Sequence, residues 1–228
     1  MEIDEYYKNL KEEDIYLPPN PQFRQFKIKK PFGATKIKKK ITSKKRLLAI
    51  LRKHSSVLDV WYSVNYFLDP TVLGRKGKSY HRNFFMFSDL FVVDIDRPTF
   101  VEQKKALMDF LAYLHKVNYP PKLIMYTGNK GFHIYLDFLF RSAAASPIDR
   151  EKENLDIKKA MIEVLEKDSG VILDKIISWD TRRVIRLPGS INARTGNLVE
   201  IVDEKDIKDF KPNHIVDILR ERKFEEYI

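Results

Sequence analysis

The 228-residue sequence contains no cysteine, so disulfide bonds and cysteine-ligated zinc are excluded within the chain. It also lacks an apolar run of the roughly 18 residues needed to cross a bilayer. Its start is acidic, with Glu2, Asp4 and Glu5, whereas a signal peptide begins with basic residues. We therefore expect an intracellular, cytoplasmic protein that has no membrane partner.

Acidic side chains are absent from a long N-terminal stretch, residues 15–58. This stretch carries 13 Lys and Arg residues with several phenylalanines among them, and the whole chain has a formal net charge of +10. A run of cations is often only a solvated surface, but its complete lack of acids favours a surface that contacts phosphates. The candidate DNA-binding residues are Arg24, Lys38, Lys39, Lys40, Lys44 and Lys45.

Hydrophobic residues make up 43% of the chain, which is enough to bury the core of one large domain. Strand and helix patterns alternate, which predicts an α/β or α+β domain. We expect a single domain with a basic N-terminal segment (1–58), a motif-bearing core (59–204) and a C-terminal helical segment (205–228). Strands are expected at 90–96, 123–126, 132–138, 171–174 and 184–187, and helices at 43–54, 99–119, 155–170 and 212–222.

Local signals place several helix boundaries. Thr42 or Ser43 can cap the first of these helices, and Thr99 with Glu102 matches the capping-box pattern. A polar loop is expected at 141–154, before a helix that Gly170 terminates. The apolar stripe of that helix comprises Ile157, Ala160, Met161, Val164 and Leu165.

Asp94 and Asp96 lie two residues apart at the end of an apolar strand pattern. Side chains two apart in a strand project from the same face. Two carboxylates held together in this way suit a hard cation such as Mg²⁺ or Mn²⁺. Taken alone, the pattern is more often a solvated strand end, and phosphatases and glycosyltransferases show the same tripeptide.

A glycine-containing connection, Thr127-Gly128-Asn129-Lys130-Gly131, joins two predicted strands and leads to His133. Glycines allow backbone amides to approach an anion closely, and the Thr127 hydroxyl and Lys130 ammonium can add donors to a phosphate. An ordinary hairpin with a core histidine is an equally good interpretation of this segment alone.

A third acid, Asp174 or Asp180, precedes an arginine-rich strand pattern that contains Arg182, Val184 and Arg186 on one face. A guanidinium among apolar neighbours is costly to bury unless an anion pairs with it. Arg186 therefore points to an anionic ligand or to a structural ion pair with an aspartate.

In this order, the three elements resemble the motifs of the archaeo-eukaryotic primase family, most closely those of the small catalytic subunit. That family shows an Asp-x-Asp strand, a Ser-Gly-x-x-Gly-x-His hairpin, and a third Asp ahead of an Arg-Leu-Pro-Gly-Ser-like string. Here these are Asp94-Ile95-Asp96, Thr127–His133, and Asp174 with Arg186-Leu187-Pro188-Gly189-Ser190. Tyr62-Ser63 also resembles a family segment, and the resemblance covers residues 55–202.

The resemblance implies a primase-polymerase core of mixed sheets flanked by helices, which binds two divalent metals, Mg²⁺ or Mn²⁺. Asp94, Asp96 and Asp174 would be the catalytic metal ligands, with Asp174 preferred to Asp180 for its spacing. The implied nucleotide-binding residues are Thr127, Gly128, Lys130, His133, Arg183, Arg186 and Asn192.

The sequence also departs from the family pattern. Thr127 replaces a serine, and Asn192 stands where a histidine usually follows the Pro-x-Ser string. Many relatives carry a zinc module of cysteines and histidines, which this chain lacks in that form. The chain is also short for the family, so we expect an accessory helical region to be missing.

The expected activity is that of the catalytic subunit of a DNA primase, a nucleotidyltransferase that makes short primers from NTPs or dNTPs on single-stranded DNA. The resemblance also implies a large primase subunit as partner. Alternatives are a primase-like polymerase of end joining or of a plasmid, a non-catalytic relative that binds single-stranded DNA, and a metal-dependent phosphohydrolase.

Overall fold

The computed structural model describes residues 2–30, 33–54, 57–72, 82–95, 97–129 and 131–216. Its helices are α1 (Ile3–Asn9), α2 (Lys44–Lys53), α3 (Phe100–Lys116), α4 (Pro147–Ser169) and α5 (Lys175–Trp179). Its strands are β1 (Phe26–Lys30), β2 (Gly33–Lys36), β3 (Asp59–Ser63), β4 (Tyr66–Phe67), β5 (Phe85–Phe87), β6 (Leu90–Ile95), β7 (Leu123–Tyr126), β8 (Phe132–Asp137), β9 (Val184–Arg186) and β10 (Glu200–Ile201).

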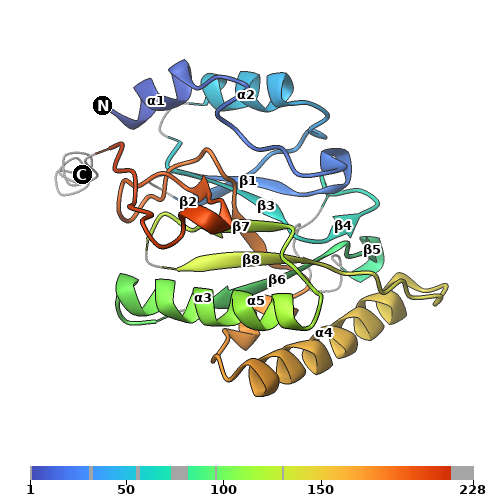
Figure 1. Cartoon of the computed structure of the whole chain (residues 1–228). Helices are drawn as coiled ribbons and strands as arrows, with labels where there is room; N and C mark the ends of the chain where they lie inside the picture. Colours follow the sequence, from blue (N-terminus) through green and yellow to red (C-terminus); the bar gives the residue numbers. More distant parts are fainter. Residues whose placement is uncertain are drawn as a thin grey trace.

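The described strands form two four-stranded sheets and a two-stranded ribbon (Figure 1). The first sheet has the order β2-β1-β3-β9, the second has the order β10-β7-β8-β6, and β4 pairs with β5. The strand pairs of these sheets are antiparallel. The expected fold class is thus confirmed, in its α+β form.

Two hydrophobic clusters divide the core between the sheets and the helices. One face of the second sheet packs against α3 and α4, through side chains such as Phe91, Ile134 and Phe110. Its other face shares a core with the first sheet and with α1 and α2, where Tyr62 and Tyr135 meet. Figure 1 shows α1 and α2 on one side of the two sheets and α3 and α4 on the other.

Most predictions made from local signals are confirmed. Strands β6, β7 and β8 lie where the sequence places them, and Ser43 caps α2 by accepting a hydrogen bond from the Arg46 amide. Thr99 and Glu102 form the expected capping box at the start of α3. Gly170 ends α4 with φ of 69°, in the left-handed region that glycine adopts without strain.

Four predictions about boundaries and faces are wrong. Helix α4 begins at Pro147, inside the expected loop, because Ser146 caps it and proline fits the first helical turn. Its buried face carries Glu151, Asn154 and Lys158 beside Ile162 and Leu165, whereas most of the predicted apolar stripe is exposed. Residues 171–174 form no strand. Residues 212–216 form no helix, because His214 instead makes an isolated bridge to Asn197; the rest of that expected helix lies outside the described residues.

Within the described part of the chain, no helix combines the length and the apolar character needed to cross a membrane.

Candidate functional site

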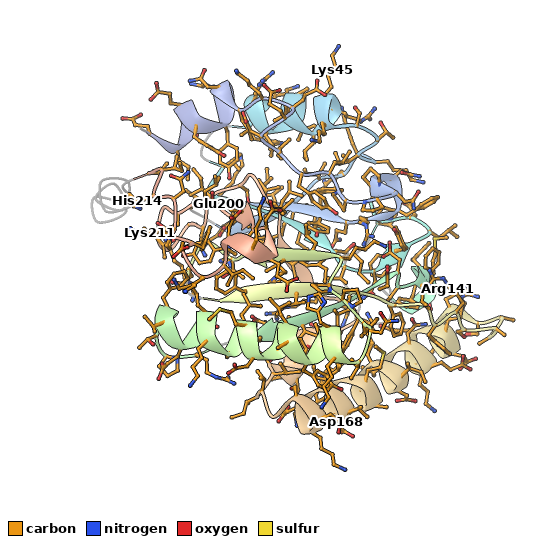
Figure 2. All side chains as sticks on the ribbon, viewed as in Figure 1. Lys45, Arg141, Asp168, Glu200, Lys211 and His214 are labelled. Carbon is orange, nitrogen blue, oxygen red and sulfur yellow. The ribbon has the colours of Figure 1, made fainter. Side chains whose placement is uncertain are left out.

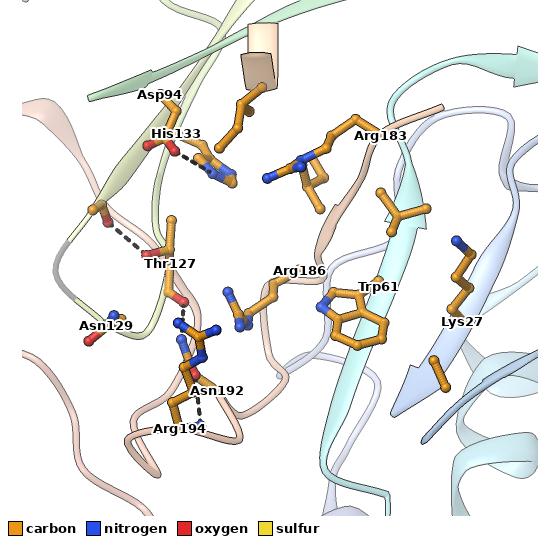
Figure 3. A pocket seen from close by; sticks show the side chains of 15 residues that line it. Lys27, Trp61, Asp94, Thr127, Asn129, His133, Arg183, Arg186, Asn192 and Arg194 are labelled. Carbon is orange, nitrogen blue, oxygen red and sulfur yellow. Dashed lines mark hydrogen bonds and ion pairs between the residues drawn. The ribbon is translucent and has the colours of Figure 1, made fainter. Parts of the chain in front are cut away.

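A cleft of about 630 Å³ is bordered by both four-stranded sheets (Figure 3). The second sheet contributes an acid, a histidine and the glycine-containing hairpin, while the first sheet contributes cations and an indole. The residues that line the cleft are Lys27, Ala34, Trp61, Asp94, Thr127, Asn129, Gly131, His133, Ile177, Arg183, Val184, Ile185, Arg186, Asn192 and Arg194. Most of the residues expected to bind a nucleotide are therefore gathered in one place.

Asp94 and His133 face the cleft side by side, because they are directly opposed partners on β6 and β8. Their side chains are almost buried, and His133 Nε2 lies 3.7 Å from Asp94 Oδ2. Asp94 Oδ1 and His133 Nδ1 are buried, and neither has a hydrogen-bond partner among the described residues. Because a buried polar atom without a partner is costly, both atoms suit a ligand that enters the cleft.

The buried, unpartnered oxygen of Asp94 fits a divalent cation, which prefers oxygen ligands. The described residues contain no cluster of three or more acidic or histidine side chains close enough to hold a metal. Asp96 lies outside the described residues. The two-metal site therefore stays a prediction. Of its predicted ligands, Asp94 lines the cleft.

Asp174 lies next to Asp94 through the backbone, since its amide donates a hydrogen bond to the Asp94 carbonyl at 2.8 Å. Its carboxylate caps α5, where Oδ1 accepts hydrogen bonds from the amides of Ile176 and Ile177. The alternative acid, Asp180, lines a different cavity with Trp179. Asp174 is thus tied to Asp94 through the backbone, and its role as a metal ligand stays a prediction.

The hairpin between β7 and β8 is held against Asp94 by its own hydrogen bonds. The amide and hydroxyl of Thr127 both donate to the Gly131 carbonyl at 3.1 Å. Gly128 has φ of 77°, and a Cβ there would come within 2.6 Å of the Asn192 Cβ, so only glycine fits. Lys130 lies outside the described residues, and its predicted phosphate contact is untested.

Arg186 projects into the cleft from β9, opposite the acidic wall (Figure 3). Its Nε donates to Asp59 Oδ1 at 2.9 Å, and Asp59 is only 1% exposed. This ion pair fixes the guanidinium and leaves its two terminal nitrogens for a ligand. Sequence reasoning missed Asp59, although it is the acid that ends the acid-free stretch.

Arg183 and Arg194 add two further guanidinium groups to the lining of the cleft. The described residues offer neither side chain a hydrogen bond or an ion pair. Among the described residues that line the cleft, Lys27 and Arg186 bring the cationic side chains to four, and Asp94 contributes the one carboxylate. This balance favours a polyanionic ligand, as triphosphates are.

Asn192 uses both ends of its side-chain amide within the protein. Its Nδ2 donates to the Thr127 carbonyl at 3.0 Å, and its Oδ1 accepts from the Arg194 amide at 2.9 Å. It therefore clamps the loop after β9 onto the hairpin between β7 and β8. A direct contact of Asn192 with a nucleotide stays a prediction.

The loop after β9 is held by residues from both ends of the described chain. The Tyr6 hydroxyl donates to the Gly189 carbonyl at 2.9 Å, and the Tyr7 hydroxyl accepts from the Ile191 amide. On the other side, the amides of residues 215 and 216 donate to the Gly196 carbonyl. The Pro-Gly-Ser string therefore has a structural role in shaping the cleft.

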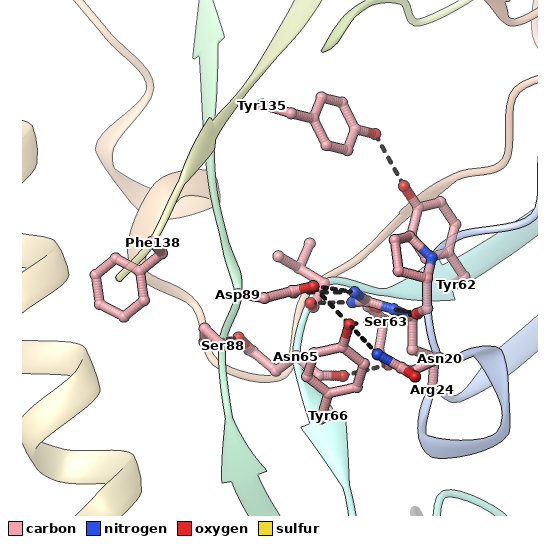
Figure 4. A network of polar contacts seen from close by, with 12 residues as sticks. Asn20, Arg24, Tyr62, Ser63, Asn65, Tyr66, Ser88, Asp89, Tyr135 and Phe138 are labelled. Atoms are coloured by element: carbon pink, nitrogen blue, oxygen red, sulfur yellow. Dashed lines mark hydrogen bonds and ion pairs between the residues drawn. The ribbon is translucent and has the colours of Figure 1, made fainter. Parts of the chain in front are cut away.

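Arg24 is wrongly predicted as a DNA contact. It is 1% exposed, and its guanidinium pairs with both oxygens of Asp89, at 2.9 and 3.1 Å, and lies over the Tyr66 ring (Figure 4). Its other nitrogens donate to backbone carbonyls, including those of Pro19 and Ser63. A cation with this set of partners is a structural cross-link.

The other predicted DNA contacts lie at or near the surface around α2. Lys38, Lys39, Lys40 and Lys45 are exposed, and Lys45 projects outward in Figure 2, while Lys44 is half-buried and donates to the Glu12 carbonyl. A second groove of about 630 Å³ is lined by Lys36, Lys38, Lys39, Arg46, Lys53 and His54 among others. Binding of DNA at these residues stays a prediction.

Comparisons with known proteins place this fold. No protein-family model matches the chain. The DNA primase small subunit PriS of Methanospirillum hungatei is 41% identical over 46 residues, a segment that makes up 20% of this chain and 12% of that protein. The chain thus matches only a small part of its curated relative.

Solved structures extend the likeness to nearly the whole chain. The polymerase domain of Mycobacterium tuberculosis ligase D, in complex with DNA, superposes with a TM-score of 0.60 at 13% identity, over 98% of this chain and 88% of that one. The AEP domain of the cyanophage S-2L primase-polymerase gives a TM-score of 0.49 at 14% identity, over 90% and 89% of the two chains. The resemblance to a primase small subunit is therefore confirmed in sequence over 46 residues, and the fold of the ligase D polymerase domain is shared over nearly the whole chain.

Proposed function

We propose that this chain is a metal-dependent nucleotidyltransferase that acts as a DNA primase, making short primers from nucleoside triphosphates on single-stranded DNA. The observation that carries the proposal is the division of charge across one cleft. Asp94, with a free buried oxygen, lies on the wall formed by the second sheet, whereas Arg186 enters the cleft from β9 and Arg183 from the position just before β9. Metal-assisted transfer of a nucleotidyl group needs this combination of a carboxylate for the cation and cations for the phosphates.

The side chains can be assigned to binding and positioning. Arg186, fixed at Nε by Asp59, and the unpaired Arg183 would bind the triphosphate, and His133 would donate to it from its buried ring. Asp94, with Asp174 beside it and Asp96, would hold the divalent cation. When bound there, the cation would neutralise phosphoryl charge and lower the pKa of the attacking hydroxyl. The protein itself orients the phosphates and excludes water, which dominates phosphoryl transfer.

The decisive experiment is primer synthesis on single-stranded DNA with labelled NTPs or dNTPs and Mg²⁺ or Mn²⁺. The Asp94→Asn variant should lose at least about 100-fold of the activity, since it loses the metal ligand. Asp168→Asn is a matched control, because Asp168 is exposed at the end of α4, far from the cleft (Figure 2). Full synthesis by the Asp94 variant would refute this metal site.

A repair polymerase is the second candidate, favoured by the likeness to the polymerase domain of ligase D. Extension of a supplied primer, without synthesis from none, would support that function. DNA binding with no product would indicate either a non-catalytic relative or the lack of the large primase subunit, which the resemblance implies. Adding a large subunit to the same assay separates these two cases.

A further inference from the structure

A row of directly opposed residues crosses the first sheet on the face that borders the cleft. Arg186 on β9 pairs with Trp61 on β3, Trp61 pairs with Lys27 on β1, and Lys27 pairs with Lys36 on β2. Opposed residues of antiparallel strands project from the same face. The row therefore leads from the cleft to β2, which is the edge strand of this sheet.

The inner members of the row are open to a ligand. Lys27, Trp61 and Arg186 line the cleft, and Figure 3 shows the indole of Trp61 between the two cations. The side chains of Lys27 and Trp61 make no hydrogen bond or ion pair with the part of the chain that the structure describes. Ala34 also lines the cleft, and its small side chain leaves space above β2.

The two lysines at the outer end form an electrostatically unfavourable pair. Partial burial lowers the pKa of Lys27 and the nearby charge of Lys36 lowers it further, while the charge of Asp180 opposes this shift in part. The pKa of Lys36 is also lowered by burial. An anion between the two ammonium groups would relieve this repulsion, so the outer end of the row suits a phosphate.

The order of chemical groups distinguishes a strand from a single nucleotide. A bound nucleotide needs cations on one side of the aromatic ring, where its phosphates lie. Here cations flank the indole on both sides, as phosphates flank a base within a strand. Four strands at a spacing of about 4.8 Å make a row about 14 Å long, which covers about four nucleotides at the 3.4 Å spacing of stacked DNA.

We propose that this row binds single-stranded nucleic acid, with one base stacked on Trp61 and the phosphates on its outer side held by Lys27 and Lys36. The site extends the cleft of the proposed nucleotidyltransferase and rests on that function for its biological meaning. It places the base on Trp61 next to the nucleoside triphosphate that Arg186 would bind, opposite Asp94 and His133. Neither Trp61 nor Lys27 was among the residues expected to bind DNA.

The chain offers a direct probe, because it contains two tryptophans and the second, Trp179, lies in a different cavity. In the Trp179→Phe protein, tryptophan fluorescence reports on Trp61. Titration with an eight-residue oligo-dT, without metal or NTP, should quench this fluorescence. In fluorescence anisotropy with a labelled oligonucleotide, Trp61→Ala should bind about 10-fold more weakly, whereas Trp61→Phe, which keeps a stacking ring, should bind nearly as well as the parent.

The lysines are tested by salt dependence. The double variant Lys27→Ala/Lys36→Ala should reduce the slope of log K against log salt by about 1.4, at about 0.7 for each lost phosphate contact on a single strand. The double variant Lys116→Ala/Lys167→Ala is the matched control, because it removes two exposed lysines from α3 and α4. Its slope should stay close to that of the parent protein.

Two results would overturn the proposal. Quenching of Trp61 by NTP and not by oligo-dT would make the indole a platform for an incoming base. Absence of quenching by either ligand, with equal salt slopes for the two lysine pairs, would show that the row binds no nucleic acid. These results differ from a failure of the proposed enzymatic function. In that case oligo-dT would still quench Trp61, but the primer-synthesis assay would give no product.

Discussion

Replacing Lys158 should change how the stability of this protein depends on pH. Lys158 lies in the middle of α4 and is 2% exposed, with its amine donating to Asn65 Oδ1 and Ser88 Oγ at 3.1 and 2.9 Å. Its pKa is lowered from 10.5 to about 7, chiefly by burial and also by the charge of Arg24, while Asp89 and Asp180 oppose the shift. Figure 4 shows the side chains of Asn65 and Ser88, its neutral acceptors.

The size of the effect follows from the two pKa values. Between pH 7 and 10.5 the unfolded chain keeps the proton on Lys158 while the folded chain releases it, so the free energy of unfolding rises with pH. This stability is fully present above pH 10.5 and is lost as the pH falls toward 7. From pH 7 to pH 9 the gain is about 2 kcal/mol, because each unit of pKa difference corresponds to about 1.4 kcal/mol.

The variant Lys158→Met keeps an unbranched chain beside the Phe138 ring but cannot titrate. Urea unfolding at pH 7, 8 and 9 should show the wild type gaining about 2 kcal/mol relative to this variant. Lys167→Met, at an exposed position of the same helix, should follow the wild type. Parallel stability curves for the wild type and Lys158→Met would refute the argument that the buried amine loses its charge near neutral pH.

Three further predictions concern the hairpin and the basic residues. Gly128→Ala should lower the free energy of unfolding by about 3 kcal/mol, because φ is positive and the new Cβ would collide with Asn192. Gly170→Ala also has a positive φ, but its Cβ would meet open space, so the cost should be about 1 kcal/mol. Urea unfolding of the two variants measures this difference. Arg24→Met should destabilise the fold by about 3 kcal/mol, since Asp89 loses its partner, yet leave the affinity of the folded protein for DNA unchanged in an anisotropy titration. The triple replacement of Lys38, Lys39 and Lys40 by Ala should lower the salt slope of single-stranded DNA binding by about 2 without changing the melting temperature, and an unchanged slope would remove these residues from the interface.

The features that the sequence predicted correctly depend on neighbouring residues. Helix caps involve residues within one helical turn, so they can be predicted from the sequence. Examples are the capping serine of α2, the Thr99–Glu102 capping box and the left-handed Gly170. Asp94 at the end of β6 and His133 after the hairpin between β7 and β8 were each predicted from local patterns, whereas their pairing on neighbouring strands was not. These local features were enough to find one wall of the cleft.

The opposite wall depends on contacts that no local pattern specifies. Trp61 faces the cleft because β3 lies between β1 and β9, a strand order that is fixed only by tertiary packing. Asp59 and Arg186 are 127 residues apart in the chain. Arg24 looked like part of a basic surface, but its partner Asp89 comes from the start of the second sheet.

The buried face of α4 shows a different limit. Periodicity assumes that apolar residues face the core, whereas the amine of Lys158 is turned inward toward polar partners from other segments, Asn65 and Ser88. Asn65 accepts from Lys158 and donates to the carbonyl of Thr181, which precedes Arg182 and Arg183 in the segment leading into β9. A polar core of this kind can be recognised only once its partners have been placed in space.

The hydrogen bonds that hold the loop after β9 determine when the cleft can form. Tyr6 and Gly189 are 183 residues apart in the chain, and the amides of residues 215 and 216 close the other side at Gly196. Contacts of such long sequence separation form late in folding and carry a large loop-closure entropy. During synthesis, a nascent chain can pair β6, β7 and β8 and pack α3 against them well before residue 216 has left the ribosome. The cleft is complete only after that, so chains shorter than 216 residues should lack the proposed site for nucleotides and DNA.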